Sequence, residues 1–488
     1  MKVLLKVSLI TIVFFSSCSY DKIEPKITYS GYPEDVGKIM TTKCAVTGCH
    51  DDVSYIAAGG LNFSTWEKLF EGSRNKNMPV IPYRSDLSFI LPFINTFSDL
   101  GTQLLPTMPV GKTPLSREEV TTLRNWIATG APDVEGYVKF SEDPDRRKIY
   151  VANQGCDLVS VFDAKTKSLM RYVNVGKYPF IETPHNIVAS PDGKFWYVVF
   201  INSNYIEKYG CSDDVKVGEI NTGIPGWHTL SISGDSKFAI AIHWDINGAI
   251  ALIDLTTFQI IEIYEGTGLF YLPHGSALNQ NGTIGYVTSQ TGNFIYKFDM
   301  TDPHNPDITF KVLQPGDFPD PYNNHFNPHQ VRFSPDYSRY YITVEARDEV
   351  RVFNSANDSL LAVIPTCEDP EEMAFSTTTP YLFVSSYEEA SVFAPNVGCI
   401  SILNYQTNTF VSNIYPGYQP HQLIVDDVNG YVFIANRNIS TTGPAPHHIS
   451  SCTGRNGYAT AIDLNTLKLI PNFKVELSVD PYSVTRRK

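Results

Sequence analysis

Short apolar stretches, some continuous and some alternating with polar residues, run through the last two thirds of the chain. Continuous apolar runs such as 195–200, 341–344 and 431–435 are typical of buried strands. Residues 249–254 and 349–354 alternate instead, as strands with one solvated face do. Turn residues separate the runs, so the pattern predicts many short strands joined by turns.

A short motif recurs seven times in this region. In most copies a proline and a histidine precede an apolar strand. Successive copies are 42 to 61 residues apart, which is about the length of one four-stranded propeller blade. In chain order, the second residues of the seven copies are His185, His228, His274, His329, Glu371, His421 and Tyr482.

The first blade lacks one strand. Residues 148–153, 158–163 and 169–175 supply three strands, and we expect the segment around Tyr482 to return and supply the innermost one. Such closure removes the free sheet edges of an open ring. The sequence therefore predicts a mainly β protein whose residues 140–488 form a seven-bladed β-propeller.

Helical spacing replaces the strand pattern before the repeats. Val36, Ile39 and Met40 lie at helical spacing, and Ser116 to Glu119 form a capping box that opens a later helix ending before Gly130. We expect a small all-α domain over residues 32–135.

The N-terminus has the features of an export signal. Lys2 and Lys6 precede an apolar run, 7–15, that is too short to span a bilayer. The run ends in Phe15-Ser16-Ser17-Cys18, which resembles a bacterial lipobox. This resemblance implies a signal peptide over 1–17, lipidation of Cys18 and a tether over 18–31. The protein is then expected to be lipid-anchored in the bacterial cell envelope, on the periplasmic side or in the outer membrane.

Charge and cysteine content narrow the function further. The formal net charge is −13 and no Lys/Arg-rich stripe occurs, so we expect no nucleic-acid partner. Export permits disulfides. Pairing Cys156 with Cys452 and Cys367 with Cys399 fits neighbouring connections of the predicted blades and leaves Cys211 as the odd thiol.

The most distinctive local motif is Cys44-Ala-Val-Thr-Gly-Cys49-His50. Two thiols can add to the vinyl groups of haem, and the histidine that follows is then held against the iron. Four residues separate the cysteines, against the usual two. A disulfide or part of a zinc site are the alternatives, although no other histidine occurs before His185.

The order of motifs around this site resembles the cytochrome c domains fused to other modules in planctomycetes and Bacteroidetes. Those domains carry a Met-Pro pair before a terminal helix, as Met108-Pro109 stands before Trp126-Ile127-Ala128-Thr129-Gly130-Ala131 in this chain. The resemblance implies haem c with His50 as the proximal and Met108 as the distal ligand. Met40 and Met78 compete with Met108. His/Met ligation favours an electron carrier.

The repeats resemble YVTN-type seven-bladed propellers. In such a fold the ring residues converge at one end of the central channel, where His185, His228, His274, His329 and His421 with Glu371 could hold a metal, copper first and zinc or iron behind. Nitrous oxide reductases and haem-containing nitrite reductases are distantly similar. Lactonase-like propellers also carry Pro-His pairs at the starts of strands. Pro328-His329, followed by Glu345 and Arg347, is similar to that pattern in this chain. A metal-free pocket or a purely structural ring are the alternatives.

These expectations combine into a haem c-containing envelope redox protein, in which electron transfer is coupled to binding or conversion of a small molecule in the propeller channel. A redox partner protein in the envelope is then required. The alternatives are a non-enzymatic electron-transfer cytochrome whose propeller is a binding module, and a lactonase-like hydrolase that uses Glu345.

Overall fold

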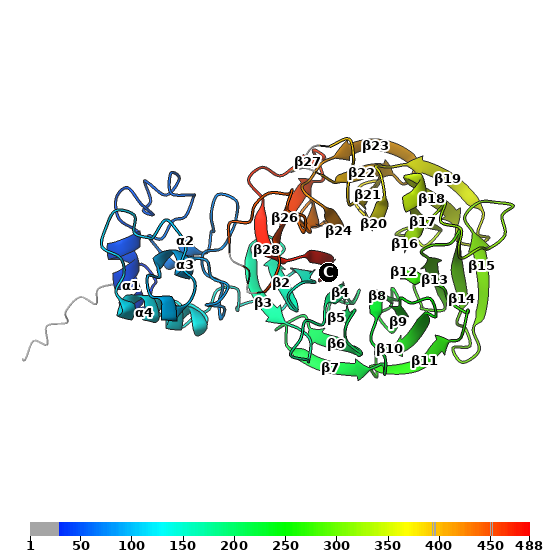
Figure 1. Ribbon diagram of the computed structural model, residues 1–488, viewed down its shortest axis with the longest axis horizontal. Helices are drawn as coiled ribbons and strands as arrows, with labels where there is room; N and C mark the ends of the chain where they lie inside the picture. The colour runs from blue at the N-terminus through cyan, green and yellow to red at the C-terminus, as the bar shows by residue number, and fades with distance from the viewer. Residues whose placement is uncertain (1–28, 393, 395–396, 449, 451) are drawn as a thin grey trace, which may run out of the picture.

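The computed structural model describes residues 29–488 apart from 393, 395–396, 449 and 451. The predicted signal peptide and Cys18 lie outside these residues. In the described part of the chain, seven antiparallel sheets stand around a central axis and a smaller unit lies beside the ring (Figure 1). The predicted seven-bladed propeller is confirmed.

Each blade of the first half of the ring has four strands, which follow one another from the axis outwards. Blade 1 consists of β29 (Pro481–Arg486), β1 (Lys148–Asn153), β2 (Leu158–Asp163) and β3 (Leu169–Asn174). Blade 2 consists of β4 (Pro184–Ala189), β5 (Phe195–Phe200), β6 (Tyr205–Gly210) and β7 (Lys216–Asn221). Blade 3 consists of β8 (Trp227–Ile232), β9 (Phe238–His243), β10 (Ala249–Asp254) and β11 (Gln259–Glu265).

The second half of the ring follows the same plan. Blade 4 consists of β12 (Pro273–Leu278), β13 (Ile284–Ser289), β14 (Phe294–Asp299) and β15 (Asp307–Val312). Blade 5 consists of β16 (Pro328–Phe333), β17 (Arg339–Val344), β18 (Glu349–Asn354) and β19 (Leu360–Pro365). Blade 6 consists of β20 (Pro370–Phe375), β21 (Tyr381–Ser386), β22 (Cys399–Asn404) and β23 (Thr409–Ile414). Blade 7 consists of β24 (Pro420–Asp426), β25 (Tyr431–Asn436), β26 (Asn456–Asp463) and β27 (Lys468–Leu469), with β28 (Val475–Val479) also paired to β26.

The two ends of the repeat region meet in blade 1. β29 pairs with β1 through Val151 and Val484 and through Tyr150 and Thr485, as the sequence predicts. The last strand thereby joins the first, which brings the C-terminus near the centre of the ring (Figure 1). This closure fixes the seventh position of the ring, Tyr482, beside the first histidine of the repeat, His185.

The N-terminal unit differs from the prediction, and the expectation of an all-α cytochrome c domain is wrong. The α-helices of the described residues are α1 (Glu34–Ile39), α2 (Trp66–Leu69), α3 (Ile90–Ile94) and α4 (Arg117–Ala128), and α4 alone exceeds two turns. A π-turn over Met40–Cys44 and a 3-10 turn over Ser98–Leu100 add little. Prolines and glycines recur every few residues between 48 and 114 and break longer helices. Loops therefore make up most of the unit.

Helix α4 is the one predicted helix that forms in full. Ser116 accepts from the backbone N–H of Glu119, whose side chain accepts in return from the backbone N–H of Ser116. Gly130 follows the helix at φ +104°, a conformation that suits glycine. Val120, Leu123 and Ile127 are buried in the apolar core that also contains Cys44. The local signals at both ends therefore determine where this helix begins and ends.

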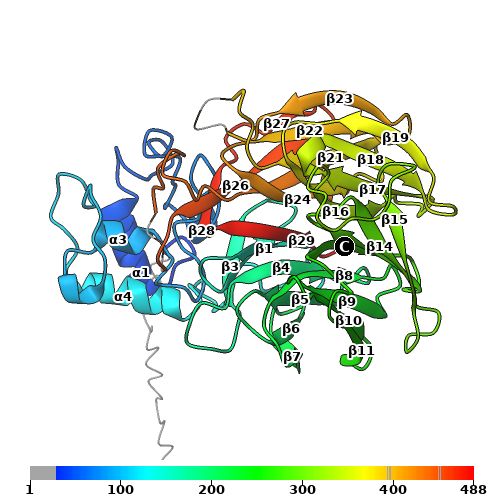
Figure 2. The same cartoon turned by 45° about the vertical axis from the view of Figure 1, so that its right-hand side comes forward.

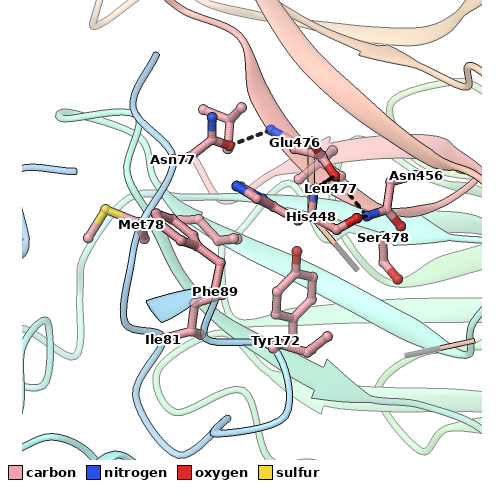
Figure 3. Close-up of a pocket in the computed structure, with 13 residues that line it drawn as sticks. Asn77, Met78, Ile81, Phe89, Tyr172, His448, Asn456, Glu476, Leu477 and Ser478 are labelled. Atoms are coloured by element: carbon pink, nitrogen blue, oxygen red, sulfur yellow. Dashed lines mark hydrogen bonds between the residues drawn. The ribbon is translucent and has the colours of Figure 1, made fainter. Parts of the chain in front are cut away.

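The N-terminal unit packs on the propeller where blade 7 meets blade 1 (Figure 2). Asn77 donates to the carbonyl of Lys474 and accepts from the N–H of Glu476 on β28. The ring of Phe89 stacks on that of His448 at 4.5 Å beside a small interface cavity (Figure 3). His448 comes from an insertion in blade 7, residues 437–457. This insertion therefore contributes to the contact between the N-terminal unit and the propeller. A second insertion, residues 301–327, contains the outer strand β15.

Two disulfides tie the propeller together, in the predicted pairing. Cys156 of blade 1 is bonded to Cys452 of the 437–457 insertion, and Cys367 to Cys399 of blade 6. Cys211 stays a free buried thiol. No helix of the described residues has the length and apolar character to cross a membrane.

Candidate metal centre

The seven ring residues meet at one end of the propeller channel, as the sequence predicts. Each stands second in the innermost strand of its blade, so the seven blades contribute one residue apiece. The ring centroids of His185 and His228 lie 4.6 Å apart and those of His274 and His329 4.3 Å apart. Tyr482 closes the circle by stacking on His421 at 3.7 Å.

The same backbone device places each ring residue. The residue two positions before it adopts a left-handed conformation in every blade: Thr183, Gly226, Leu272, Asn327, Asp369, Gln419 and Asp480. The strand register then shifts at the ring residue itself, which is the mark of a β-bulge. Non-glycine residues with positive φ are uncommon and costly. Six of them at one repeat position therefore indicate a feature maintained to aim these side chains into the channel.

The ring divides into two groups of donor atoms within the described residues. His185, His228 and His274 offer three nitrogen atoms, and His329, Glu371 and His421 offer two nitrogens and a carboxylate oxygen. Within each group the donor atoms all lie within 4.8 Å of one another. Three ligands at this separation can close around one metal ion with small side-chain movements.

Backbone carbonyls fix the tautomer of most of these histidines. Nδ1 of His274 faces the carbonyl of His329, Nδ1 of His329 faces that of Glu371, and Nδ1 of His421 faces that of Tyr482, at 3.1 to 3.3 Å. A carbonyl only accepts, so each Nδ1 carries the proton. The lone pair is then on Nε2, which is the arrangement of a metal-ligating histidine.

Burial keeps the ring histidines neutral. It lowers the pKa of His228 and of His274 to about 3 and that of His329 to about 4. Neighbouring histidines and Arg437 add to the burial that holds the pKa of His185 and of His421 well below its usual range. The ring is therefore a set of uncharged nitrogen donors at neutral pH.

The Glu371 carboxyl faces one of these nitrogens. Its Oε2 lies 3.4 Å from Nε2 of His421 and has no hydrogen-bond partner, and Nε2 of His185 is likewise buried without one. Burial, with Glu345 nearby, raises the pKa of Glu371 well above its usual range. Two acceptor atoms that face each other need a proton or a cation between them.

A second carboxyl, Glu345, lies at the rim of the ring. It follows β17 and places Oε1 3.9 Å from Nε2 of His329. Burial, with repulsion from Asp369, raises the pKa of Glu345 to about 8. This carboxyl can accept and return a proton near neutral pH. Arg347, by contrast, stacks on Phe326 away from the ring.

Arg437 is a neighbour of the ring that the sequence pattern does not predict. Its guanidinium lies 4.6 Å from the ring centroid of Tyr482 and pairs with both carboxylate oxygens of Asp480 at 2.6 and 3.0 Å. Asp480 immediately precedes the seventh motif, so alignment of the repeats places it next to a ring position. The recurring histidines are a stronger signal at the same positions. Arg437 makes the ring asymmetric, with a cation on the side of His421.

A belt of buried, hydrogen-bonded polar side chains lies next to the ring on the inner strands. Gln330 and Gln422 both donate to the carboxylate of Glu372, and Ser483 donates to Gln422. Asn186 continues the belt by donating to Ser483. The ring is therefore bordered on one side by side chains whose polar groups are paired with one another.

The N-terminal unit holds the Cys44–His50 motif in a form that suits haem attachment. Cys44 and Cys49 are both free, so the alternative of a disulfide between them does not form. Nδ1 of His50 lies 3.0 Å from the carbonyl of Leu61, which leaves its Nε2 as the donor for a metal. The His50 ring also stacks on Phe63 at 4.5 Å.

Met108 is partly buried against the apolar core that contains Cys44. Its rivals Met40 and Met78 are almost fully buried in that core, and Met78 also lines the interface cavity of Figure 3. Apolar side chains close in sequence to both candidate iron ligands are exposed: Val53 and Ile56 after His50, and Leu105 and Val110 around Met108. A flat apolar group such as a porphyrin would cover side chains of this kind.

Comparison with known proteins adds the fold alone. No protein-family model and no curated protein matches the chain. Among solved structures it is similar to a functionally unknown protein from Desulfotomaculum acetoxidans, with 13% sequence identity and a TM-score of 0.51. That match covers 68% of this chain and 99% of the other. At such low identity it supports the propeller architecture and carries no function.

Proposed function

We propose that this chain is a haem c-containing redox protein of the cell envelope that holds a transition metal, copper first, on the histidine ring of its propeller. The observation that carries the proposal is the pair of three-donor groups at one channel mouth. A small molecule bound at that mouth would exchange electrons with the metal, and the haem would exchange them with a partner protein.

Uncompensated donor atoms support the metal. The three Nδ1 atoms bonded to carbonyls leave three Nε2 lone pairs at the channel mouth, and Nε2 of His185 with Oε2 of Glu371 lack any partner. Buried polar atoms without partners are costly, and a cation satisfies several of them at once.

The donor types suggest which metal each group prefers. Three neutral imidazoles, as in His185, His228 and His274, suit copper, with zinc as the competitor. Two imidazoles and one carboxylate, as in His329, His421 and Glu371, also match the ligand set of non-haem iron(II). We assign copper to the three-histidine group. Metal analysis decides which metal the second group holds.

The donor set of the N-terminal unit fits a covalently attached haem. Cys44 and Cys49 would hold the porphyrin through thioether bonds, with His50 and Met108 as the ligands of the iron. The bound group would supply one-electron transfer. The protein's own contribution is to fix the tautomer of His50 through Leu61 and to bury the ligands in an apolar core.

Metal content of single-site variants tests the ring. The full chain, matured with haem and loaded with Cu²⁺, is compared with His274→Ala and His421→Ala, and with His325→Gln as an exposed histidine outside the ring. We expect copper in the parent and in the control, and loss of about one copper per chain in His274→Ala. Equal copper in all four proteins would reject the ring as the metal site.

A second candidate function rests on Glu345. Its carboxyl, with a pKa of about 8 and 3.9 Å from His329, has the properties of a general base, as a lactonase-like hydrolase requires. Ester or lactone turnover by the double variant Cys44→Ser/Cys49→Ser, after its ring metal has been removed with a chelator, would support it. The redox proposal expects no turnover in that protein.

A further inference from the structure

The propeller channel has a second mouth, at the end opposite the histidine ring. All seven innermost strands run away from the ring, so their last residues lie about 13 Å from it at a rise of 3.3 Å per residue. A cavity of about 380 Å³ opens there. The ends of β4, β8, β12, β16, β20 and β29 line it.

The charged side chains of this cavity are all cationic. Arg332, Arg486 and Lys488 line it, and its lining contains neither aspartate nor glutamate. The chain as a whole has a net charge of −13, so a cationic cavity departs from the average surface. Nε of Arg332 is buried without a hydrogen-bond partner, and the nearest carboxylate contact of its guanidinium is Glu372 at 3.5 Å. The Arg332 guanidinium is thus poorly neutralised by the protein itself.

The remaining lining is largely apolar. Phe333 and Phe375 come from the ends of β16 and β20 in neighbouring blades, and Ile232, Leu278 and Tyr337 also line the cavity. An inorganic anion would leave these surfaces in contact with water. An organic anion would satisfy both the cations and the apolar wall.

The buried polar belt separates this cavity from the histidine ring. Glu372 lies between them, bonded to Gln330 and Gln422 on the belt and paired with Arg332 at the cavity. Binding in the cavity therefore needs neither the metal nor the haem.

We propose that the second mouth is a binding site for a small organic carboxylate. Arg332 and Arg486 donate to the carboxylate oxygens, and the hydrocarbon body lies against Phe333 and Phe375. Guanidinium groups suit this role because they bind carboxylates through two parallel hydrogen bonds.

Calorimetric titration of the full chain, without added metal, tests the site with benzoate as the probe. Benzamide has the same shape without the charge, and inorganic phosphate has charge without the apolar body. We expect benzoate to bind most tightly, and Arg332→Gln or Arg486→Gln to weaken its binding at least about tenfold, because each removes a charge-assisted hydrogen bond.

The control variant is Lys237→Gln, which removes one positive charge from an exposed turn outside the cavity and should leave benzoate binding unchanged. Far-ultraviolet circular dichroism confirms that each variant is folded. Two independent arginine variants keep the test valid if one fails to fold. Equal binding of benzamide, equal binding of phosphate, or unchanged affinity in both arginine variants would overturn the proposal. None of these outcomes affects the proposed metal and haem sites.

Discussion

At the scale of single residues, the ring is governed by neutral histidines next to carboxyls that resist ionisation. Carbonyl contacts direct the Nε2 lone pairs of His274, His329 and His421 into the channel, and burial keeps these rings uncharged. Glu371 differs from the histidines because burial favours its protonated form, in which the proton competes with a metal. The two donor groups should therefore respond differently to acid.

The first prediction concerns the release of metal as pH falls. Histidines whose pKa lies near 3 stay unprotonated to well below pH 5, so the group of His185, His228 and His274 should retain its metal there. The group containing Glu371 should release its metal first, because protons compete for that carboxylate at a higher pH. Metal content after dialysis between pH 8 and pH 4 measures both groups. Release of all metal in one step would contradict this difference.

The second prediction concerns Glu345. Its pKa in the folded protein, about 8, lies above the ordinary 4.5, so the folded state favours the protonated form. Its contribution to stability is complete below about pH 4.5 and is lost as pH rises through about 8. Glu345→Gln should therefore leave the free energy of unfolding of the metal-free protein unchanged near pH 5. Near pH 9 it should raise the free energy of unfolding by about 4 kcal/mol, since each unit of a pKa shift corresponds to about 1.4 kcal/mol.

Thermal unfolding at the two pH values gives this result directly. The exposed Glu265→Gln serves as control and should change the midpoint little at either pH. A stabilisation by Glu345→Gln that is equal at pH 5 and pH 9 would show that the carboxyl does not titrate in this range.

At the scale of elements, the fold depends on how the ring of blades is closed. β29 joins blade 1 through hydrogen bonds, and the disulfide from Cys156 to Cys452 joins blade 1 to blade 7 over a sequence separation of 296. The disulfide from Cys367 to Cys399 spans only 32 residues. Loop-closure entropy makes the longer loop the more stabilising one.

The third prediction compares the two disulfides. The double variant Cys156→Ser/Cys452→Ser should lose about 2 kcal/mol more unfolding free energy than Cys367→Ser/Cys399→Ser, from the loop lengths alone. Cys211→Ser measures the cost of a buried serine where no disulfide is lost. Denaturant unfolding of the three variants provides the values. A larger loss from the shorter loop would show that local packing outweighs chain entropy.

Most of the propeller could be predicted from the sequence because its signals are local and repeated. The strands 148–153, 158–163, 249–254 and 349–354 appear with the predicted bounds, since turn residues mark both ends of each. The return of Tyr482 to blade 1 also follows, because the first blade lacks one strand. Repetition thus carried information that single segments do not have.

The N-terminal unit shows where this reasoning fails. The capping box at Ser116 predicted α4 correctly, because side-chain caps act within one turn. The helical spacing before Cys44 gave only α1 and a π-turn, and loops rich in proline and glycine fill the rest. Tertiary packing decides such segments. Arg437 was missed for a related reason, since only the closed ring brings it to Tyr482.

At the scale of the whole molecule, the N-terminal unit and the propeller share one continuous apolar core at the junction of blades 7 and 1. Phe89 on His448 and Asn77 on Glu476 hold them in a fixed relation. The proposed haem and the proposed copper lie on opposite sides of this junction.

The fourth prediction separates the two centres. Cys44→Ser/Cys49→Ser should lack covalently bound haem yet retain copper on the ring, because every ring residue comes from an innermost strand of the propeller. Optical spectra of the denatured protein and its copper content measure the two properties. His50→Ala is the companion variant and should keep the thioether bonds while altering the iron spectrum. Loss of copper along with haem would show that the ring depends on the N-terminal unit.

The central claim, haem and a ring-bound metal in one chain, is tested most directly by quantifying both in a single sample of the matured protein. The pyridine haemochrome spectrum reports covalent haem, and elemental analysis reports total iron and copper per chain. We expect one haem per chain and at least one copper beyond it. A sample with no haemochrome band, or with no metal other than haem iron after copper loading, would contradict it.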